Sequence, residues 1–198
     1  PVCSSAASDV YKRQPLKNII AGVDEVGRGA IAGPVIAAAV ILKKDIEGLK
    51  DSKKISEKKR IELSNKIKKY SYFAIGSASH NEIDKFNILN ASLLAMKRAI
   101  LNLPIKPTKI LVDGIHKPDL DIEMEVSIGG DSLIKQISAA SIIAKVYRDN
   151  LMYKFDKKFS VYGFKNNKGY GTKQHYSALE INGHSTIHRR TFKGVLKR

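Results

Sequence analysis

The apolar positions of this chain fall into two kinds of pattern. Short continuous or alternating runs of apolar and β-branched residues are typical of strands, whereas apolar positions three and four apart are typical of helices. The first kind predicts strands at about 19–23, 35–42, 70–79, 109–113 and 122–128. Because the link between the first two runs is short, we expect them to form an antiparallel hairpin.

Helical spacing marks the segments between and after these strands. Ser56 is a typical N-cap for a helix with a lysine-rich outer face. A second helix is expected over 87–101, and Pro104 prevents it from continuing. Near the C-terminus, a loop rich in Gly, Asn and Lys is expected at 160–171, followed by a short helix at 172–181.

The longest periodic segment runs from Asp131 to about Phe159 and predicts one long helix with a buried stripe and a polar face. The stripe is expected to contain Leu133, Ile137, Ala140, Ala144, Tyr147, Leu151 and Phe155. The polar face is expected to contain Asp131, Lys135, Ser138, Lys145 and Asp149. Lys145 and Asp149 are four apart, so we expect them to form a surface pair.

This order of elements predicts an α/β fold, with a mixed sheet flanked by helices and a small helical C-terminal extension. We expect residues 18–159 to form the main domain and residues 160–198 a basic, substrate-binding extension. Residues 1–17 show no periodicity and are expected to be a tail, disordered or non-native. The longest apolar run, 35–42, is far shorter than the roughly 20 residues that cross a bilayer, so no membrane association is expected.

The charge balance changes the picture of what the chain binds. The sequence holds 35 Lys and Arg against 19 Asp and Glu, a formal net charge of +16, which predicts a polyanionic partner such as nucleic acid. The single cysteine, Cys3, excludes an internal disulfide and fits a reducing, cytoplasmic location. We expect the protein to act as a monomer.

The few acidic residues include a group at the ends of predicted strands: Asp24 and Glu25, Asp113, and Asp131 just before the long helix. Carboxylates placed there can converge at one edge of a sheet, where oxygen ligands suit Mg²⁺ or Mn²⁺. In a basic protein this indicates phosphodiester hydrolysis with two metal ions. The alternative is that Asp113 only forms a turn and Asp131 only caps a helix. Because neighbouring strand residues point to opposite faces, the strand is expected to end or bulge at Asp24.

The glycine-rich segment 27–32 matches the G-x-G-x-x-A dinucleotide fingerprint. That fingerprint requires a helix directly after the glycines, but Pro34 and the β-branched run 35–42 predict a strand there. We therefore favour a loop whose backbone approaches a nucleic acid closely, with Arg28 available for a phosphate. A tight hairpin turn with a solvated arginine is the alternative.

Two further groups of residues have a composition that allows a function. His184 and His188 are four apart, but the surrounding sequence does not favour a helix and no third ligand is near, so we expect no metal site there. A basic run comprises Lys53, Lys54, Lys58, Lys59 and Arg60. Such a run is ordinarily a solvated helix face, and with the overall charge it is also a candidate phosphate track.

Seven blocks occur in a characteristic order: IAGVDEVGRGAIAGP (20–34), DSKK (51–54), VDG (112–114), GDS (130–132), SAASIIAKVYRD (138–149), NKGYGT (167–172) and HRRTF (188–192). In this order they resemble bacterial ribonuclease HII, and the match extends over nearly all of residues 18–192. The first and fifth blocks are long enough to be specific. The others are short and persuade only by their order.

The resemblance implies a ribonuclease H-like fold and a metal-dependent endonuclease. Its expected substrates are RNA–DNA hybrids, whose RNA strand it cuts, and duplex DNA with embedded ribonucleotides, which it nicks 5′ of the RNA–DNA junction. The expected products carry 3′-hydroxyl and 5′-phosphate ends. The family's four metal-binding carboxylates fall on Asp24, Glu25, Asp113 and Asp131, which are expected to hold two Mg²⁺ or Mn²⁺ ions.

The resemblance also implies substrate-binding residues. The family's 2′-hydroxyl-sensing loop falls on Gly27, Arg28 and Gly29, and its junction-reading tyrosine falls on Tyr170. A phosphate-contacting lysine falls on Lys53.

Two departures from the family pattern concern the neighbours of the carboxylates. Gly130 stands before Asp131 where the family often has lysine, and Ile115-His116 follows the VDG block where asparagine is common. Two rival interpretations remain. A noncatalytic nucleic-acid-binding domain explains the charge but not the placed carboxylates. A nucleotide-dependent enzyme rests on the glycine match, against which Pro34 argues.

Overall fold

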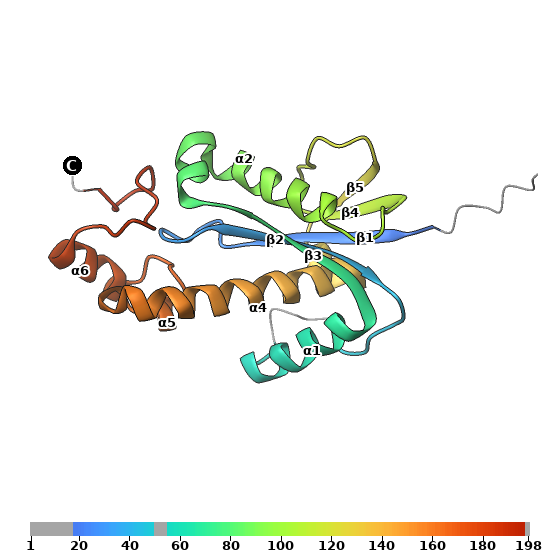
Figure 1. Cartoon of the computed structure of the whole chain (residues 1–198), viewed down its shortest axis with the longest axis horizontal. Coiled ribbons are helices and arrows are strands. Elements are labelled where there is room, and N and C mark those ends of the chain that lie inside the picture. Colours follow the sequence, from blue (N-terminus) through green and yellow to red (C-terminus); the bar gives the residue numbers. More distant parts are fainter. Residues whose placement is uncertain (1–17, 50–54, 197–198) are drawn as a thin grey trace, which may run out of the picture.

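The computed structural model describes residues 18–49 and 55–196, and a five-stranded sheet lies at its centre (Figure 1). The strands are β1 (Ile20–Val26), β2 (Val35–Leu42), β3 (Ser71–Ala78), β4 (Lys109–Asp113) and β5 (Glu123–Ser127). Their order across the sheet is β3-β2-β1-β4-β5. The first three strands pair antiparallel, and β4 and β5 run parallel to β1. The predicted mixed sheet and the predicted hairpin are therefore confirmed.

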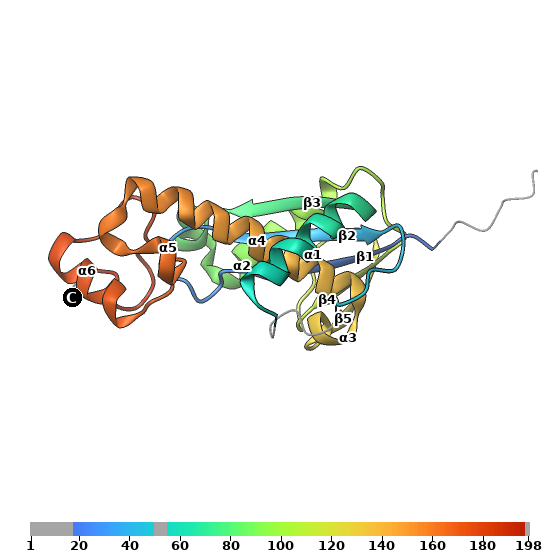
Figure 2. The ribbon, with the colours of Figure 1, turned by 90° about the horizontal axis from the view of Figure 1, so that it is seen from below.

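Helices cover both faces of this sheet. They are α1 (Glu57–Tyr70), α2 (His80–Leu101), α3 (Gly130–Leu133), α4 (Lys135–Lys158), α5 (Phe164–Asn167) and α6 (Lys173–Asn182). Figure 1 shows α2 on one face and α1 and α4 on the other, and Figure 2 shows α4 crossing the sheet towards α5 and α6. Among the described residues, no helix is both long enough and apolar enough to span a membrane.

The continuous apolar sequence of β2 follows from this layering. Val35, Ala37 and Ala39 pack in the cluster beneath α2, while Ile36 and Ala38 pack in the cluster beneath α1 and α4. Because β2 is buried on both faces, neither set of alternating side chains contacts water, and the strand appears in the sequence as an unbroken apolar run.

Helix α4 crosses β1 at very short range because β1 carries Gly22 at the crossing. A Cβ atom at Gly22 would lie 2.1 Å from the backbone carbonyl carbon of Gln136, so any other residue would force the helix away. This contact brings the N-terminal end of α4 against the strand segment that carries Asp24.

Three predictions about the elements are wrong in detail, and the first concerns β1. The strand neither ends nor bulges at Asp24, because Asp24, Glu25 and Val26 keep a regular antiparallel register with β2. Pairing with β4, on the other side, stops at Val23. One edge of β1 is therefore still paired while the other opens towards α3 and the end of β4.

The second correction concerns α2, which begins at His80 instead of Asn87. Ser79 and Glu82 form a reciprocal capping box at its start, which satisfies the first free backbone N–H groups. Asn87 has a φ of 67° and interrupts the helix, and its side chain accepts a hydrogen bond from the Asn90 N–H. The apolar periodicity from residue 87 onwards therefore marks the second part of α2.

The third correction concerns the long helix from Asp131. Ile134 adopts an extended conformation with φ −115° and ψ 118°, which separates α3 from α4. The single stripe is therefore broken, and Leu133 is 72% exposed while Asp131 and Ser138 are buried. Tyr147, also assigned to the stripe, is 48% exposed.

The C-terminal segment packs through a third apolar cluster, which joins Ile31 and Ala32 to Met152 at the end of α4 and to residues of 162–195. The predicted helix at 172–181 is confirmed as α6, which is capped by Thr172. The expected loop at 160–171 is more ordered than predicted, because it contains a 3₁₀ turn at Ser160–Tyr162 and helix α5.

Candidate metal and nucleic-acid site

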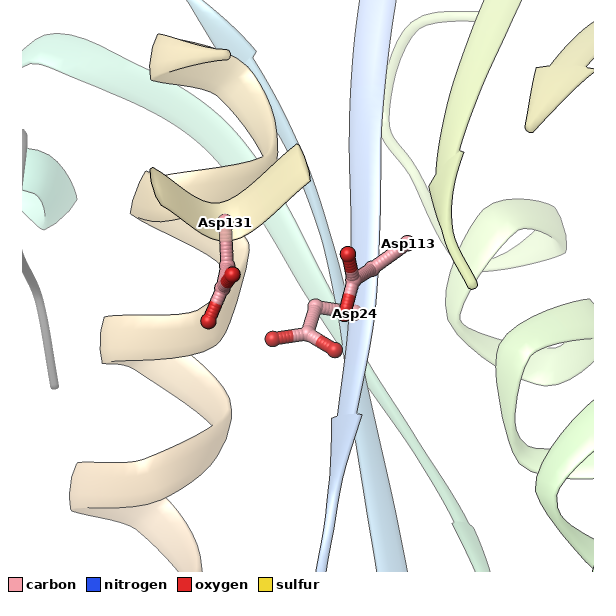
Figure 3. A group of neighbouring side chains, drawn as sticks. All are labelled: Asp24, Asp113 and Asp131. Atoms are coloured by element: carbon pink, nitrogen blue, oxygen red, sulfur yellow. The ribbon is translucent and has the colours of Figure 1, made fainter. Parts of the chain in front are cut away.

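Three aspartates from separate elements converge at one end of the sheet. Asp24 lies in β1, Asp113 is the last residue of β4, and Asp131 lies in α3. One carboxylate oxygen from each lies within 4.8 Å of the others. Figure 3 shows the carboxylates of Asp24 and Asp131 reaching towards each other from the sheet and from the helix, with Asp113 beside Asp24.

The parallel pairing of β1 and β4 explains how the first two aspartates meet. Val23 pairs with Val112, so Asp24 and Asp113 come next on adjacent strands at the same edge. Asp131 arrives from α3, whose first residue, Gly130, is closely packed. A Cβ atom at Gly130 would lie 2.6 Å from Cδ1 of Ile137, so a larger residue there would require the end of the Ile137 side chain to shift.

The environment of Asp24 disfavours an isolated negative charge. Burial is the main cause that raises the pKa of Asp24 to about 8, and the neighbouring carboxyl groups of Glu25 and Asp113 raise it further. Hydrogen bonds from Ser141 and from the Glu25 N–H, 2.7 Å from Oδ1, partly oppose this rise. Like charges this close need a cation between them if all are to be ionised.

The donor set fits a hard divalent cation. Carboxylate oxygens are the ligands that Mg²⁺ and Mn²⁺ prefer, and an octahedral Mg²⁺ with ligands at about 2.0–2.1 Å holds opposite oxygens about 4 Å apart. The observed upper limit of 4.8 Å is close to that spacing. Asp24, Asp113 and Asp131 are therefore the residues that would hold such an ion.

Glu25 lies beside this cluster without joining it. Its Oε1 accepts a hydrogen bond from Nη1 of Arg28 at 3.1 Å, and its Oε2 is buried without a hydrogen-bond partner among the described residues. Burial raises the pKa of Glu25, against the opposing influence of Arg28. Because successive side chains of a regular strand point to opposite faces, the side chains of Glu25 and Asp24 leave β1 on opposite faces.

A cleft of about 310 Å³ connects the carboxylates with Tyr170, one of the sequence-predicted substrate residues. Asp24, Glu25 and Asp113 line it together with Tyr170. Tyr170 is half-buried, and a bridge between Ala30 and Tyr170 joins its segment to the chain that follows the 27–29 turn. The structure therefore brings the turn, the tyrosine and the acidic cluster to one place.

The other predicted residues have different outcomes. Lys53 lies outside the described residues. Lys145 and Asp149 form the expected pair, with 2.8 Å between Nζ and Oδ1, and Lys145 also lines the cleft. His184 is exposed, and His188 pairs instead with His175, with 3.0 Å between the two Nε2 atoms.

Sequence reasoning assigned no role to several residues close to the cleft. Ser141 lines the cleft, as does Arg60, which the sequence placed only in the basic run that is a candidate phosphate track. Arg148 and Arg189 are fully buried beneath the 27–29 turn. The only signal for Arg189 was its place in the HRRTF block, and pattern analysis gives no reason to bury it.

Comparison with known proteins agrees with this arrangement. A family model described as Ribonuclease HII matches residues 21–195. The chain belongs to the ribonuclease HII family. Ribonuclease HII of Pelagibacter ubique is 56% identical over 180 residues, which cover 89% of this chain and 97% of that relative. Ribonuclease HII of Nitrosospira multiformis is 54% identical and covers 89% of this chain and 90% of its own length.

Solved structures agree on the fold. The ribonuclease H2 of Pyrococcus horikoshii OT3 superposes with a TM-score of 0.75 at 28% identity, covering 89% of this chain and 94% of that one. Bst-RNase HIII, solved in complex with Mn²⁺, has a TM-score of 0.68 at 19% identity, covers 89% of this chain and 68% of that one, and supports the fold alone. As a ribonuclease HII, the chain is a hydrolase with ribonuclease H activity on RNA–DNA hybrids.

The raised pKa of Asp24 leads to a stability prediction for the metal-free enzyme. Between pH 4 and pH 8, which are about the pKa values of Asp24 in the unfolded and folded protein, Asp24 is protonated in the folded state and ionised in the unfolded state. The free energy of unfolding should therefore fall as the pH rises through this range. Asp24→Asn removes this penalty and should stabilise the metal-free enzyme at pH 8 by about 1–2 kcal/mol, or roughly 2–8 °C in Tm.

Thermal melts of both proteins in chelator, at pH 5 and pH 8, test this expectation. The gain should shrink at pH 5, where Asp24 keeps its proton. Adding Mn²⁺ should raise the wild-type Tm at pH 8 and raise that of Asp24→Asn much less. An equal gain at both pH values would contradict the assignment of the buried charge to Asp24.

Proposed function

We propose that this ribonuclease HII is a metal-dependent endoribonuclease that also nicks duplex DNA 5′ of the RNA–DNA junction at embedded ribonucleotides. The products are 3′-hydroxyl and 5′-phosphate ends. The observation that carries the proposal is the convergence of three carboxylates, two of which, Asp24 and Asp113, line a cleft together with Tyr170.

The carboxylates have the role of ion ligands in this proposal. Asp24, Asp113 and Asp131 would hold Mg²⁺ or Mn²⁺, and Glu25 would complete the acidic site from the neighbouring side. Two bound divalent ions would supply charge stabilisation and water activation for phosphodiester hydrolysis. The protein's own contribution is to hold the carboxylates in a buried position where their charge needs a cation.

We assign substrate recognition to two elements near the acidic cluster, the 27–29 turn and Tyr170. Gly27, Arg28 and Gly29 present backbone groups to the 2′-hydroxyl of the ribonucleotide, because the glycines allow a close approach. Tyr170 packs its ring against the sugar or base at the junction. Lys53 and the basic C-terminal extension, residues 160–198, contact phosphates farther along the duplex.

Binding to the hybrid should depend steeply on salt, because the +16 charge acts through the release of counterions from phosphates. Between 50 and 200 mM salt, we expect the affinity for a 20-base-pair hybrid to fall by at least about tenfold. The measurement is a fluorescence anisotropy titration without divalent ions, which prevents turnover. An affinity that stays constant over this range would contradict the phosphate contacts.

The decisive test is incubation with duplex DNA that contains one ribonucleotide, with and without divalent ions. We expect a single nick on the 5′ side of the junction with Mg²⁺ or Mn²⁺, a product with a free 3′-hydroxyl that a polymerase can extend, and no cleavage in chelator. An all-DNA duplex is the control and should stay intact. Binding without cleavage under every metal condition would favour the noncatalytic domain instead.

A further inference from the structure

Arg189 lies directly beneath the substrate-facing turn and is fully buried. Its guanidinium donates three hydrogen bonds to backbone carbonyls: Nη2 to Gly27 at 2.7 Å, Nη1 to Arg28 at 2.8 Å, and Nε to Gly33 at 2.9 Å. The planar guanidinium presents its donors in a fixed geometry, so it fixes the carbonyls of the turn relative to one another.

Arg148 connects the same loop to the segment that carries Tyr170. From α4 its Nη1 donates to the Lys168 carbonyl at 2.8 Å and its Nη2 to the Ala32 carbonyl at 3.2 Å. Its Cζ atom lies 5.4 Å from the centre of the Tyr170 ring. Gly27 packs on this arginine so closely that a Cβ atom there would lie 2.1 Å from Nε. The turn and the tyrosine therefore rest on one side chain.

Burying the charged side chains of Arg148 and Arg189 costs desolvation free energy. Burial lowers the pKa of both guanidinium groups, and that of Arg189 falls to about 9 with Arg148 nearby. All the hydrogen bonds that the structure gives them end on carbonyl oxygens, which carry only partial charge. Apolar side chains often stabilise a core as well as buried charges do, so the arginines need a role beyond stability.

A pair of buried histidines supports the Tyr170 segment from the other side. The carbonyl of Tyr170 can only accept, so Nδ1 of His175 donates to it at 2.9 Å. Nε2 of His175 must then accept from Nε2 of His188, 3.0 Å away, and Nδ1 of His188 accepts from the Ser185 N–H at 3.0 Å. With both imidazoles neutral, each of their four ring nitrogens therefore has a hydrogen-bond partner.

We propose that Arg148, Arg189 and the His175–His188 pair are positioning residues that fix the distance between the 27–29 turn and Tyr170. Neither the arginines nor the histidines touch the substrate. They hold the two recognition elements at the separation that a ribonucleotide junction requires, and so determine how well the enzyme selects junctions over continuous hybrids. This inference rests on the proposed function, which assigns junction recognition to those elements.

The test compares cleavage of a single-ribonucleotide duplex with cleavage of a long hybrid in Arg148→Lys, Arg189→Lys and His175→Phe. Lysine keeps the charge but cannot span three carbonyls in a fixed plane, and phenylalanine keeps the ring without its hydrogen bonds. We expect the ratio of single-ribonucleotide to hybrid kcat/KM to fall at least fivefold in each variant. The loss should be in kcat, with KM within threefold, because the basic surface is unchanged.

A matched control is Arg98→Lys, which alters a structural arginine on α2 that binds Glu82 and the Ser77 carbonyl, 2.7 Å from each. It should lower Tm without changing the substrate ratio. In every positioning variant, the Tm increase on adding Mn²⁺ should equal that of the wild type, because the carboxylates are intact. His175→Phe introduces no new charge into the core, so it keeps the test available if a lysine variant fails to fold.

The outcomes separate the inference from the proposed function. Positioning variants that lose stability but keep the wild-type ratio would overturn the inference, because a merely structural role predicts that result. If the wild type does not nick the single-ribonucleotide duplex, or if Tyr170→Ala leaves the ratio unchanged, the proposed function fails and the inference falls with it. A reduced ratio with normal Mn²⁺ stabilisation supports the positioning role.

Discussion

Asp131→Asn is expected to reduce cleavage of an RNA–DNA hybrid by about 10³-fold or more while leaving hybrid affinity within roughly threefold. Asp131 lies in the cluster whose oxygens are within 4.8 Å of one another, and asparagine keeps its size but removes the charge. Ion binding depends on that charge, whereas hybrid binding depends on the positive surface. Single-turnover cleavage and anisotropy titrations in parallel measure the two effects.

Asp119→Asn is a suitable control because it makes the same change of charge at an exposed position. It should leave cleavage within about twofold, so a large loss in Asp131→Asn cannot come from net charge. Near-normal turnover of Asp131→Asn with Mg²⁺ would remove Asp131 from the proposed ligand set. A loss of affinity as large as the loss of cleavage would show that the aspartate shapes the binding surface instead.

The acidic cluster could be predicted in part because it depends on sheet topology. Asp24 and Asp113 end apolar runs, and parallel pairing of those strands brings the two residues to one edge. The position of Asp131 follows from the break at Ile134, which has no proline or glycine to mark it. Periodicity alone predicts one continuous helix, so the sequence does not show this break.

The sequence also contains a signal for the start of α2. Ser79 and Glu82 have the spacing of a capping box and mark the true start of α2. The apolar pattern that begins at Asn87 favours a helix start there, but Asn87 has a positive φ, a conformation that asparagine adopts more readily than most residues.

The buried arginine and histidine side chains that contact the 27–29 turn and the Tyr170 segment could not be predicted from the sequence pattern. Arg189 binds carbonyls more than 150 positions away in the chain, and His188 pairs with a histidine in another segment. Arginine and histidine are mostly surface residues in a basic chain, and only the tertiary contacts show that these are enclosed. The family resemblance supplied the HRRTF block, but not what its members contact.

Tyr170→Ala is expected to reduce nicking at a single embedded ribonucleotide far more than cleavage of a long hybrid. The ring lines the cleft and lies over Arg148, where it can pack against a sugar or base next to the scissile phosphate. Loss of one such stacking contact is worth roughly 1–3 kcal/mol, or about 5- to 150-fold in rate. Tyr170→Phe should keep most of the activity, because packing needs the ring and not the hydroxyl.

The competing explanation is that Tyr170 anchors the C-terminal segment on the core through the bridge to Ala30. An anchoring role predicts a lower Tm and an equal loss on both substrates, since the bridge involves backbone groups that alanine also has. Tyr153→Ala removes a 44% exposed tyrosine from α4 and controls for the loss of an aromatic surface. Melting curves together with the ratio of the two kcat/KM values decide between the roles, and an unchanged ratio in Tyr170→Ala would exclude junction reading by this residue.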